Sequence, residues 1–416
     1  MKRVLFIAPQ PFFSVRGTPM NVREFTRCLG ELTLDVDLLV YPHGDDVALT
    51  GVRIRRCPEL PLVKHVPIGF SIQKVLYDCL LFIHAFLLCI RHRYTVIHGV
   101  EEAGIIAGIL GSIFNIPYVM DFDSCVEDEL RRTDIPFSNL AANLFAKFQS
   151  VFIKRAKLIV TVAPYLTDYI RDICPSATIA QIEDCPLETP AVSERTNGAL
   201  EFPASKTVML YTGNFETYQG LDLLFESLEK ANKLQAELSN RLQVVLVGGE
   251  PKQIAEYSAK ASKLGISSLL QFLGLRPTHE MYDLMNKADF LVSPRLVGIN
   301  TPLKIYTYMQ SGKPIIATSI AAHTGILSDS VAFVSAAEPG PFSALILEAI
   351  RLHEENSTEP KLRAAAALDL LERRFSREAF RNKVANAYRA ILPSQIEVPQ
   401  ANAMSAELSS EVSEIK

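Results

Sequence analysis

Residues 289–318 read Asp289-Phe-Leu-Val-Ser-Pro-Arg-Leu-Val-Gly-Ile-Asn-Thr-Pro-Leu-Lys-Ile-Tyr-Thr-Tyr-Met-Gln-Ser-Gly-Lys-Pro-Ile-Ile-Ala-Thr318. The order of apolar and turn-forming residues predicts a buried strand, a loop, a helix, a tight turn and a second buried strand. Thr301 is typical of a helix N-cap and Pro302 of the first helical turn. Gly312 is typical of the position just after a helix, and Pro314 prevents the helix from continuing. A helix is therefore expected to begin at the carboxyl end of a parallel strand.

This arrangement favours a binding site for an anion such as a phosphate. Backbone N–H groups at a helix N-terminus have no partner within the helix, and the helix dipole attracts negative charge there. Arg295 and Lys304 place two cationic side chains beside the expected N-terminus. The alternative is an ordinary strand–turn–helix connection with two solvated cations, and this stretch alone leaves both interpretations open.

Length and composition indicate a globular protein with two domains. The 416 residues exceed what one hydrophobic core usually holds, and 48% hydrophobic with 21% charged residues is a globular composition. A net charge of −4 gives no reason to expect a nucleic-acid partner. The seven cysteines have no metal-ligand spacing, which favours a reduced, cytoplasmic compartment and no metal site. Residues 1–8 lack the pattern of a signal peptide and are expected to contain the first strand.

Apolar runs of strand length alternate with stretches of helical periodicity along most of the chain, which predicts two α/β domains with parallel sheets. We expect a first domain at residues 1–187, a polar linker at 188–205 and a second domain at 206–375. Residues 376–392 are expected to form a last helix, and the polar residues 393–416 a disordered tail.

One segment raises the question of a membrane. Residues 75–90 are strongly apolar, but Asp78 and His84 interrupt them, and the run is shorter than a membrane span requires. We therefore expect a buried or half-buried helix of the first domain. A helix lying on a membrane surface is the alternative.

Candidate site residues follow the predicted strands, because ligands of open α/β sheets bind outside the carboxyl ends of the strands. The loops of the second half are rich in glycine, which lets the backbone approach a ligand closely. The candidates there are Gly213, Asn214, Gly274, Arg276 and Arg295. The corresponding loops of the first half contribute Gly17, Thr18, His98, Glu101, Glu102, Asp121 and Asp123. The two sheet edges are expected to face each other across a cleft, with one ligand held by each domain.

Asp121 and Asp123 directly follow an apolar strand, where carboxylates can orient a sugar hydroxyl or act as a general base. Helix capping by Asp123 or Ser124 is the alternative. Two carboxylates exceed what a cap needs, which favours a functional role.

The other polar residues at these edges have equally good structural explanations. Glu101 and Glu102 are also expected in the first turn of a helix, where they complement the helix dipole. His98 can be a core histidine with satisfied hydrogen bonds, and His323, which follows the strand at 315–318, can be an ordinary loop histidine.

Three motifs together resemble glycosyltransferase family 4, a family of the GT-B fold. Pro302-x-Lys304-x3-Tyr-Met-x2-Gly-Lys-Pro-Ile-Ile-Ala-Thr318 is similar to the donor-site helix of that family. Residues 211–224, Tyr-Thr-Gly-Asn-Phe-Glu-Thr-Tyr-Gln-Gly-Leu-Asp-Leu-Leu, resemble the loop that opens its second domain. Phe272-Leu-Gly274, followed by residues 281–289, resembles its nucleotide-binding segment.

The resemblance extends from about Val4 to Leu392. It implies two Rossmann-like α/β domains of the GT-B fold and a last helix that crosses back onto the first domain. It also implies a UDP- or GDP-linked sugar donor in the second domain, a saccharide or lipid-linked acceptor in the first, and no separate cofactor.

The chain departs from the family pattern at several positions. Family members commonly carry a Glu-x7-Glu pair across the donor helix, and the matching positions here are Ile299 and Thr307. The usual arginine and lysine of the opening loop fall on Asn214 and Gln219, and a histidine of the first domain falls on Asp123. The carboxylates and cations that usually hold the donor are therefore missing.

We expect Arg295 and Lys304 to replace the missing cations, because burying an unpaired diphosphate is costly. Backbone N–H groups near Leu303 are expected to complete the phosphate site, and the hydroxyl of Thr307 or Tyr306 to contact the ribose. The expected donor residues of this helix are Thr301, Pro302, Leu303, Lys304 and Thr307.

The expected activity is transfer of a sugar from the nucleotide donor to a hydroxyl of the acceptor, in polysaccharide or glycoconjugate synthesis, and the resemblance implies retention of the anomeric configuration. Asp123, and secondly Asp121, is expected to orient the acceptor. A lipid-linked acceptor would give the apolar helix a role at the inner face of a membrane. The alternatives are a sugar-nucleotide epimerase of the same fold and a non-catalytic binding protein.

Overall fold

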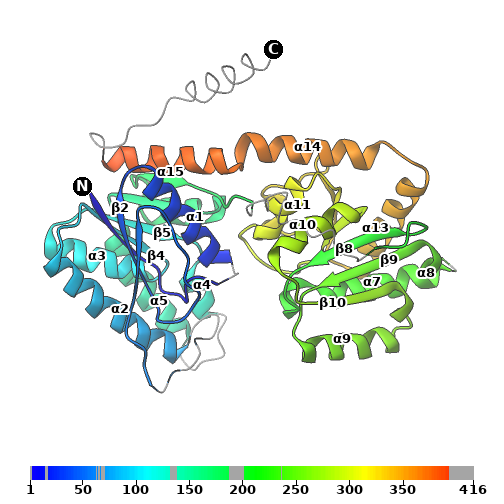
Figure 1. Ribbon diagram of the computed structural model, residues 1–416, viewed down its shortest axis with the longest axis horizontal. Coiled ribbons are helices and arrows are strands. Elements are labelled where there is room, and N and C mark those ends of the chain that lie inside the picture. Colours follow the sequence, from blue (N-terminus) through cyan, green and yellow to red (C-terminus); the bar gives the residue numbers. More distant parts are fainter. Residues whose placement is uncertain are drawn as a thin grey trace, which may run out of the picture. The chain divides into compact units, whose positions relative to one another are not determined.

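The computed structural model describes residues 2–14, 17–61, 63, 66, 71–131, 138–186, 201–235 and 237–392. The chain divides into two compact units (Figure 1). Met1–Ile182 together with Arg381–Lys416 form the first unit, and Glu183–Phe380 form the second unit. The divisions after 182 and 380 differ by a few residues from the expected ends at 187 and 375. The expected linker at 188–205 lies mostly, and the expected tail at 393–416 entirely, outside the described residues.

The first unit is built on a parallel sheet with the strand order β3-β2-β1-β4-β5-β6-β7. The strands are β1 (Arg3–Ile7), β2 (Asp35–Val40), β3 (Val52–Arg56), β4 (Val96–Val100), β5 (Tyr118–Phe122), β6 (Leu158–Thr161) and β7 (Ile179–Gln181). Almost all residues of β1, β2, β4, β5 and β6 are buried. Continuous apolar runs are typical of parallel strands that helices cover on both faces.

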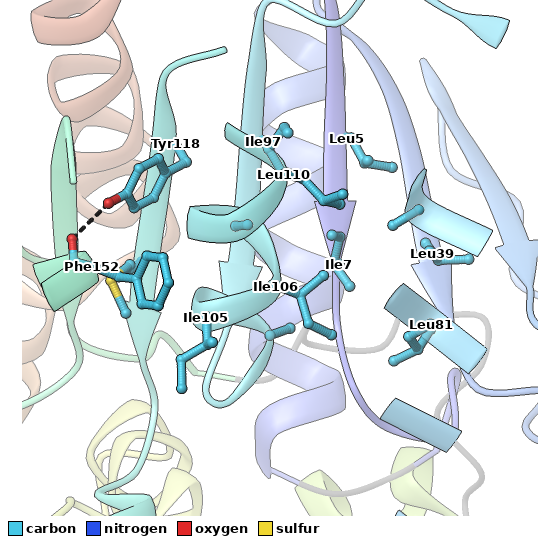
Figure 2. Close-up of a cluster of buried hydrophobic side chains, with 14 of the residues drawn as sticks. Leu5, Ile7, Leu39, Leu81, Ile97, Ile105, Ile106, Leu110, Tyr118 and Phe152 are labelled. Carbon is cyan, nitrogen blue, oxygen red and sulfur yellow. Dashed lines mark hydrogen bonds between the residues drawn. The ribbon is translucent and has the colours of Figure 1, made fainter. Parts of the chain in front are cut away.

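The helices of the first unit are α1 (Gly17–Glu31), α2 (Ile72–Arg91), α3 (Ala103–Phe114), α4 (Val126–Arg131), α5 (Ser138–Ile153), α6 (Pro164–Ile173) and the part of α15 (Arg377–Ile391) from Arg381 onward. Side chains of α2, α3 and α5 form one buried cluster with those of the strands, so these helices cover the same face of the sheet. Figure 2 shows Ile7 of β1 near Ile106 of α3 within this cluster. The Tyr118 hydroxyl of β5 donates to the carbonyl of Phe152 in α5 at 2.7 Å, which ties this helix to the sheet.

The apolar segment of the first half lies in a helix that is long enough to span a membrane. It forms α2, which has 20 residues, so the expectation that it is too short to span a membrane was wrong. By length and composition alone, α2 is the one helix of the described residues that could cross a membrane. Its Tyr77, Leu81 and Ala85 are completely buried in the core of the sheet, however, which makes α2 an element of the α/β domain.

The second unit contains a parallel sheet with the strand order β10-β9-β8-β11-β12-β13. Its strands are β8 (Thr207–Thr212), β9 (Leu242–Val247), β10 (Leu270–Gly274), β11 (Phe290–Ser293), β12 (Ile315–Thr318) and β13 (Phe333–Ser335). Its helices are α7 (Leu221–Leu234), α8 (Leu238–Arg241), α9 (Pro251–Lys263), α10 (Thr278–Lys287), α11 (Leu303–Gln310), α12 (Ala321–Thr324), α13 (Pro339–Glu354) and α14 (Glu359–Arg374). Both sheets thus have the parallel α/β architecture that the alternation of apolar runs predicted.

Strand order reverses at one place in each sheet. In the first unit β1 lies between β2 and β4, and in the second unit β8 lies between β9 and β11. Ligands of open parallel sheets bind outside the carboxyl ends of the strands at such switch points. The loops that follow β1 and β4, and those that follow β8 and β11, are therefore the places to look for functional side chains.

The donor-site helix begins one residue later than the Thr301 cap implies. The N-cap of α11 is Pro302, in extended conformation, and the first helical residue is Leu303. The predicted N-cap role of Thr301 was therefore wrong. Its hydroxyl instead forms a hydrogen bond with Tyr306 of the helix that follows.

Candidate functional site

Two glycines of the second unit allow close contact between the loops that follow β8, β9 and β11. Gly220 (φ 77°) precedes α7, and a Cβ there would lie 1.9 Å from the carbonyl oxygen of Pro294. Gly248 (φ 117°) follows β9, and a Cβ there would lie 1.9 Å from the carbonyl oxygen of Gly213. A side chain at either position would push the loops apart, so the close approach of these loops requires glycine.

Lys304, in the first turn of α11, directs its ammonium group toward the end of β8. The Nζ atom lies 4.3 Å from the centre of the Tyr211 ring and 3.0 Å from the position that a Cβ would take at Gly213. It is buried and has no hydrogen-bond partner among the residues that the structure describes. The aromatic ring attracts the cation but does not replace the three hydrogen bonds that an ammonium group makes in water. The site therefore contains a buried donor group whose hydrogen-bonding capacity is unused.

Arg295, in the loop after β11, brings a second cation to the same place. Its guanidinium carbon lies 5.2 Å from the centre of the Tyr218 ring, and its Nε donates to the carbonyl of Val297 at 2.8 Å. Gly298 makes room for it, because a Cβ there would lie 2.8 Å from a guanidinium nitrogen. No carboxylate is among the groups that shift the pKa of Arg295 or Lys304.

The electrostatics of these two cations favour an anion. Burial, reinforced by the charge of Arg295, lowers the pKa of Lys304 to about 7. Burial also lowers the pKa of Arg295. A diphosphate would supply the negative charge and the acceptor oxygens that both side chains lack. No side chain caps α11 at Pro302, so its first backbone N–H groups can also donate to an anion.

His323 of α12 supports this site, although the sequence analysis gave it no role. Its Nδ1 donates to the carbonyl of Thr318 at 2.9 Å, and its Nε2 accepts from the hydroxyl of Ser293 at 3.0 Å. Burial, with the charges of Lys304 and Arg295, lowers the pKa of His323 to about 4. The imidazole is therefore neutral near pH 7 and ties the end of β11 to the end of β12. Its position after a predicted strand was the only signal in the sequence.

The predicted hydroxyl residues of α11 are engaged within their own segment. The Thr301 hydroxyl forms its hydrogen bond with Tyr306. The Thr307 hydroxyl donates to the carbonyl of Leu303 at 3.4 Å, which is a long and weak contact. A ribose hydroxyl could replace that contact, and the role of Thr307 in holding the donor stays a prediction.

The other predicted donor residues lie at the same edge of the second sheet. Gly274 ends β10 and accepts a hydrogen bond from the N–H of Gly248 at 2.8 Å. The side chain of Asn214 is exposed, and its Oδ1 accepts from a nearby backbone N–H. Arg276 is exposed and lies 3.8 Å from the carboxylate of Glu280. Of the predicted cations, the structure therefore brings together Arg295 and Lys304 and leaves Arg276 on the surface.

In the first unit, a buried histidine links β4, β5 and α15. The Nε2 atom of His98 lies 3.0 Å from Oδ2 of Asp121, and its Nδ1 lies 2.8 Å from the hydroxyl of Tyr388. The Phe6 ring stacks on the imidazole at 4.1 Å between ring centres. The other carboxylate oxygen of Asp121, Oδ1, is buried and has no hydrogen-bond partner in the described part of the chain. His98 thus orients Asp121 through one oxygen and leaves the second oxygen available.

Replacing Tyr388 with phenylalanine is expected to lower the free energy of unfolding by about 1–3 kcal/mol, because the buried Nδ1 of His98 loses its partner. Urea unfolding followed by circular dichroism measures this loss. A change smaller than about 0.5 kcal/mol would contradict a structural role of the hydrogen bond.

Asp123 lies one residue beyond β5, at the carboxyl edge of the same sheet. It is half-buried, and its Oδ1 accepts a hydrogen bond from the side-chain amide of Asn21 in α1 at 3.3 Å. Gly17 and Thr18 form the first turn of α1, with Gly17 exposed and Thr18 half-buried. The start of α1 and the end of β5 thus meet at this edge, where a carboxylate can reach an acceptor hydroxyl.

Glu101 and Glu102 belong to a cluster of half-buried carboxylates at the start of α3. The Glu101 carboxylate accepts from the hydroxyl of Ser124 at 2.9 Å, and Lys74 of α2 forms an ion pair with Glu102 at 2.7 Å. Burial raises the pKa of Glu102 to about 8, although the nearby charge of Lys74 lowers it. Burial also raises the pKa of Asp78 to about 6. Glu102 takes the N-cap position of α3 without a side-chain capping bond.

Among the described residues, no group of three or more His, Cys, Asp or Glu side chains is arranged to hold a metal ion.

Comparisons with known proteins agree with this geometry. Residues 206–353 match the family described as glycosyl transferases group 1. The chain is 24% identical over 323 residues to the D-inositol 3-phosphate glycosyltransferase of Corynebacterium aurimucosum, covering 73% of this chain and 75% of that one. Sucrose-phosphate synthase of Thermosynechococcus elongatus has a similar structure, with a TM-score of 0.70, 17% identity and coverage of 95% and 100% of the two chains. HepE of Anabaena in complex with UDP-glucose gives a TM-score of 0.67 at 14% identity, covering 94% and 100%.

The structural neighbours have the GT-B fold, which confirms the fold expected for the two parallel-sheet units. The family match covers the second unit, where the glycine-containing loops, Arg295 and Lys304 are found. The chain is therefore a glycosyltransferase of the GT-B fold, and its residues 206–353 match the family of glycosyl transferases group 1.

Proposed function

We propose that this glycosyltransferase moves a sugar from a UDP- or GDP-linked donor, held by the second unit, to a hydroxyl of a saccharide or lipid-linked acceptor, held by the first unit. The sugar keeps its anomeric configuration, and the product enters a polysaccharide or glycoconjugate on the cytoplasmic side. The observation that carries the proposal is the buried ammonium of Lys304, which has no hydrogen-bond partner and lies in one site with Arg295.

The proposed chemistry follows from what these cations can do for a leaving group. When the bond between sugar and diphosphate breaks, negative charge grows on the phosphate oxygens. Fixed donors in a water-poor site stabilise such charge without having to reorganise. Lys304, Arg295 and the first N–H groups of α11 are donors of this kind. The structure of HepE with UDP-glucose adds support for a nucleotide-sugar donor, as the fold of that protein is similar.

On the acceptor side, Asp123 and Asp121 are the proposed orienting groups. Asp121 is held by His98 and keeps one buried oxygen without a partner, while Asp123 is half-buried at the same edge. A carboxylate that accepts a hydrogen bond from an acceptor hydroxyl both orients it and increases its nucleophilicity.

The two rival functions are less well supported. The relative from Corynebacterium aurimucosum is named a glycosyltransferase, and this name supports neither an epimerase nor a non-catalytic protein. Incubation with a panel of UDP- and GDP-sugars separates the three. Transfer or donor hydrolysis supports a transferase, an isomerised donor indicates an epimerase, and no turnover by the folded protein indicates a binding protein.

Replacing Arg295 with alanine is expected to weaken binding of UDP or GDP by roughly 10- to 100-fold, because a hydrogen bond to a charged group contributes about 1.5–3 kcal/mol. Isothermal titration calorimetry measures the dissociation constant. Arg351→Ala is the matched control, because Arg351 is an exposed arginine of the same unit that pairs with Glu355. Equal affinity of wild type and Arg295→Ala would refute the proposed phosphate contact.

A further inference from the structure

The outer side of α2 is apolar over its whole length. Six large hydrophobic side chains that are between 42% and 75% exposed recur at helical spacing: Ile72, Val75, Leu76, Ile83, Leu87 and Ile90. The opposite side contributes Tyr77, Leu81 and Ala85 to the core. A surface helix normally presents a polar outer face to water, so α2 has an apolar stripe where polar residues are expected.

A second apolar stripe runs along α5. Leu140, Leu144, Phe148 and Val151 are between 45% and 61% exposed, and their spacing of four, four and three residues places them on one side of the helix. The other side of α5 is buried through Phe152 and its neighbours. Both α2 and α5 therefore have a core face and an equally apolar outer face.

The two stripes belong to one surface of the first unit. Helix α3 packs against both α2 and α5, and the buried sides of all three helices cover the same face of the sheet (Figure 1). Their outer sides must therefore all point away from that face. Ile113 on α3 is 57% exposed as well. We call the exposed hydrophobic residues of α2, α3 and α5 the apolar face.

The charged residues of α5 and of the turn that follows it are all basic. Residues 138–157, which include α5, contain no acidic residue, and their charged side chains Lys147, Lys154, Arg155 and Lys157 are all exposed. The only acidic residue of α2 is Asp78, which accepts a hydrogen bond from Tyr41 and is not exposed. We call Lys147, Lys154, Arg155 and Lys157 the basic border of the apolar face. The chain as a whole has a net charge of −4, so this excess of positive charge is local.

We propose that the apolar face binds the surface of an anionic phospholipid bilayer, with α2 and α5 lying in the plane of the interface. Amphipathic helices with large hydrophobic side chains and basic flanks bind there, because apolar burial and attraction to anionic lipids add together. A second copy of the chain would instead bring two basic borders together, which like-charge repulsion disfavours. Because the core side of α2 is fixed by the sheet, the helix lies on the bilayer and does not cross it.

The proposal does not depend on the donor site, but it adds to the proposed function. The first turn of α2 carries Lys74, which contacts Glu102 at the carboxyl edge of the first sheet. The turn of α2 that contains Ile72, Lys74 and Val75 is therefore joined to the same edge of the sheet at which Asp121 and Asp123 lie. A bilayer bound there would present a lipid-linked acceptor to that edge of the first unit.

The test is co-sedimentation of the full chain with phosphatidylcholine vesicles that contain or lack phosphatidylglycerol. Binding to the anionic vesicles is expected, and it should weaken at high salt. The paired substitutions Ile83→Glu/Leu87→Glu and Leu144→Glu/Phe148→Glu should each lower the vesicle affinity roughly tenfold or more, because burial of each large apolar side chain is lost. Replacing Lys147 by glutamine should lower the affinity for anionic vesicles about fivefold and leave neutral vesicles unaffected.

The matched control is Leu234→Glu/Leu362→Glu, because these two leucines of the second unit are 73% and 66% exposed. It should bind vesicles like the wild type. All variants change exposed side chains, so their melting temperatures should agree with that of the wild type. The proposal is overturned if anionic vesicles fail to sediment the protein or if the paired substitutions leave binding unchanged. It is also overturned if sedimentation velocity without lipid shows a dimer that the same substitutions dissociate.

Discussion

Replacing Lys304 with methionine is expected to raise the melting temperature of the unliganded protein while lowering its affinity for UDP or GDP roughly 10- to 100-fold. Methionine keeps the length and packing of the side chain but removes a buried ammonium that has no hydrogen-bond partner. In the complex, the same change removes a charge-assisted contact with the diphosphate. Stability and donor binding should therefore change in opposite directions.

The stabilising effect of Lys304→Met should depend on pH in a defined direction. The pKa of Lys304 is about 7 in the folded protein and near its usual 10.5 in the unfolded chain. Between these values the unfolded chain binds more protons, so the wild type becomes more stable as pH rises from 7 toward 10.5. Below pH 7 the cost of the buried charge is present in full. The difference in melting temperature between variant and wild type should thus be largest below pH 7 and shrink at pH 9.

Binding of a diphosphate should follow the opposite dependence. A diphosphate favours the protonated lysine, so binding above pH 7 takes up a proton, and affinity falls by up to about tenfold per pH unit there. Calorimetry in buffers of different ionisation enthalpy detects this proton uptake. Lys260→Met serves as control, since Lys260 already pairs with Asp222 at 2.6 Å. If Lys304→Met binds UDP and GDP as tightly as the wild type at pH 7, Lys304 is not part of the donor site.

Replacing Asp123 with asparagine is expected to lower the rate of sugar transfer by about 10²- to 10⁴-fold, the usual contribution of a general acid–base group. Asparagine has nearly the same shape and can still pair with Asn21, but it cannot accept a proton from the acceptor hydroxyl. Asp123 belongs to the first unit, so affinity for the nucleotide at the second unit should not change.

The measurement is kcat for transfer, with donor affinity determined in parallel. Asp172→Asn provides a matched control, because Asp172 is an exposed carboxylate at the end of α6 in the same unit. A kcat within about threefold of the wild type would show that Asp123 has no part in activating the acceptor.

Most of the fold follows from local patterns. Continuous apolar runs predicted the central strands of both sheets, because a parallel strand covered by helices needs no polar face. The strands β7 and β13 were not predicted, since each has only three residues and leaves no periodicity to recognise. The cap at Thr301 was wrong because its hydroxyl forms a hydrogen bond with Tyr306, a second local partner that the capping pattern does not distinguish.

Part of the candidate donor site could be predicted as well, because it also depends on local patterns in the sequence. Arg295 and Lys304 lie nine positions apart in one strand–loop–helix segment, so local structure alone brings them to one edge of the sheet. Their burial could not be predicted from that segment. It depends on Tyr211 at the end of β8 and on the backbone at Gly213, which belong to a different part of the unit.

The sequence by itself determined two parallel α/β sheets and the place of the proposed phosphate site, since both depend on residues that are close along the chain. Only the tertiary structure decided that Lys304 is buried without a partner and that the outer sides of α2 and α5 are exposed. It also decided that His98 contacts both Asp121 and Tyr388, although Tyr388 lies 290 residues from His98 along the chain. Periodicity shows that a helix has an apolar side, but which sides are covered depends on packing between distant segments. For this reason the chemistry of Lys304 and Asp121, and the apolar face, became visible only in the folded chain.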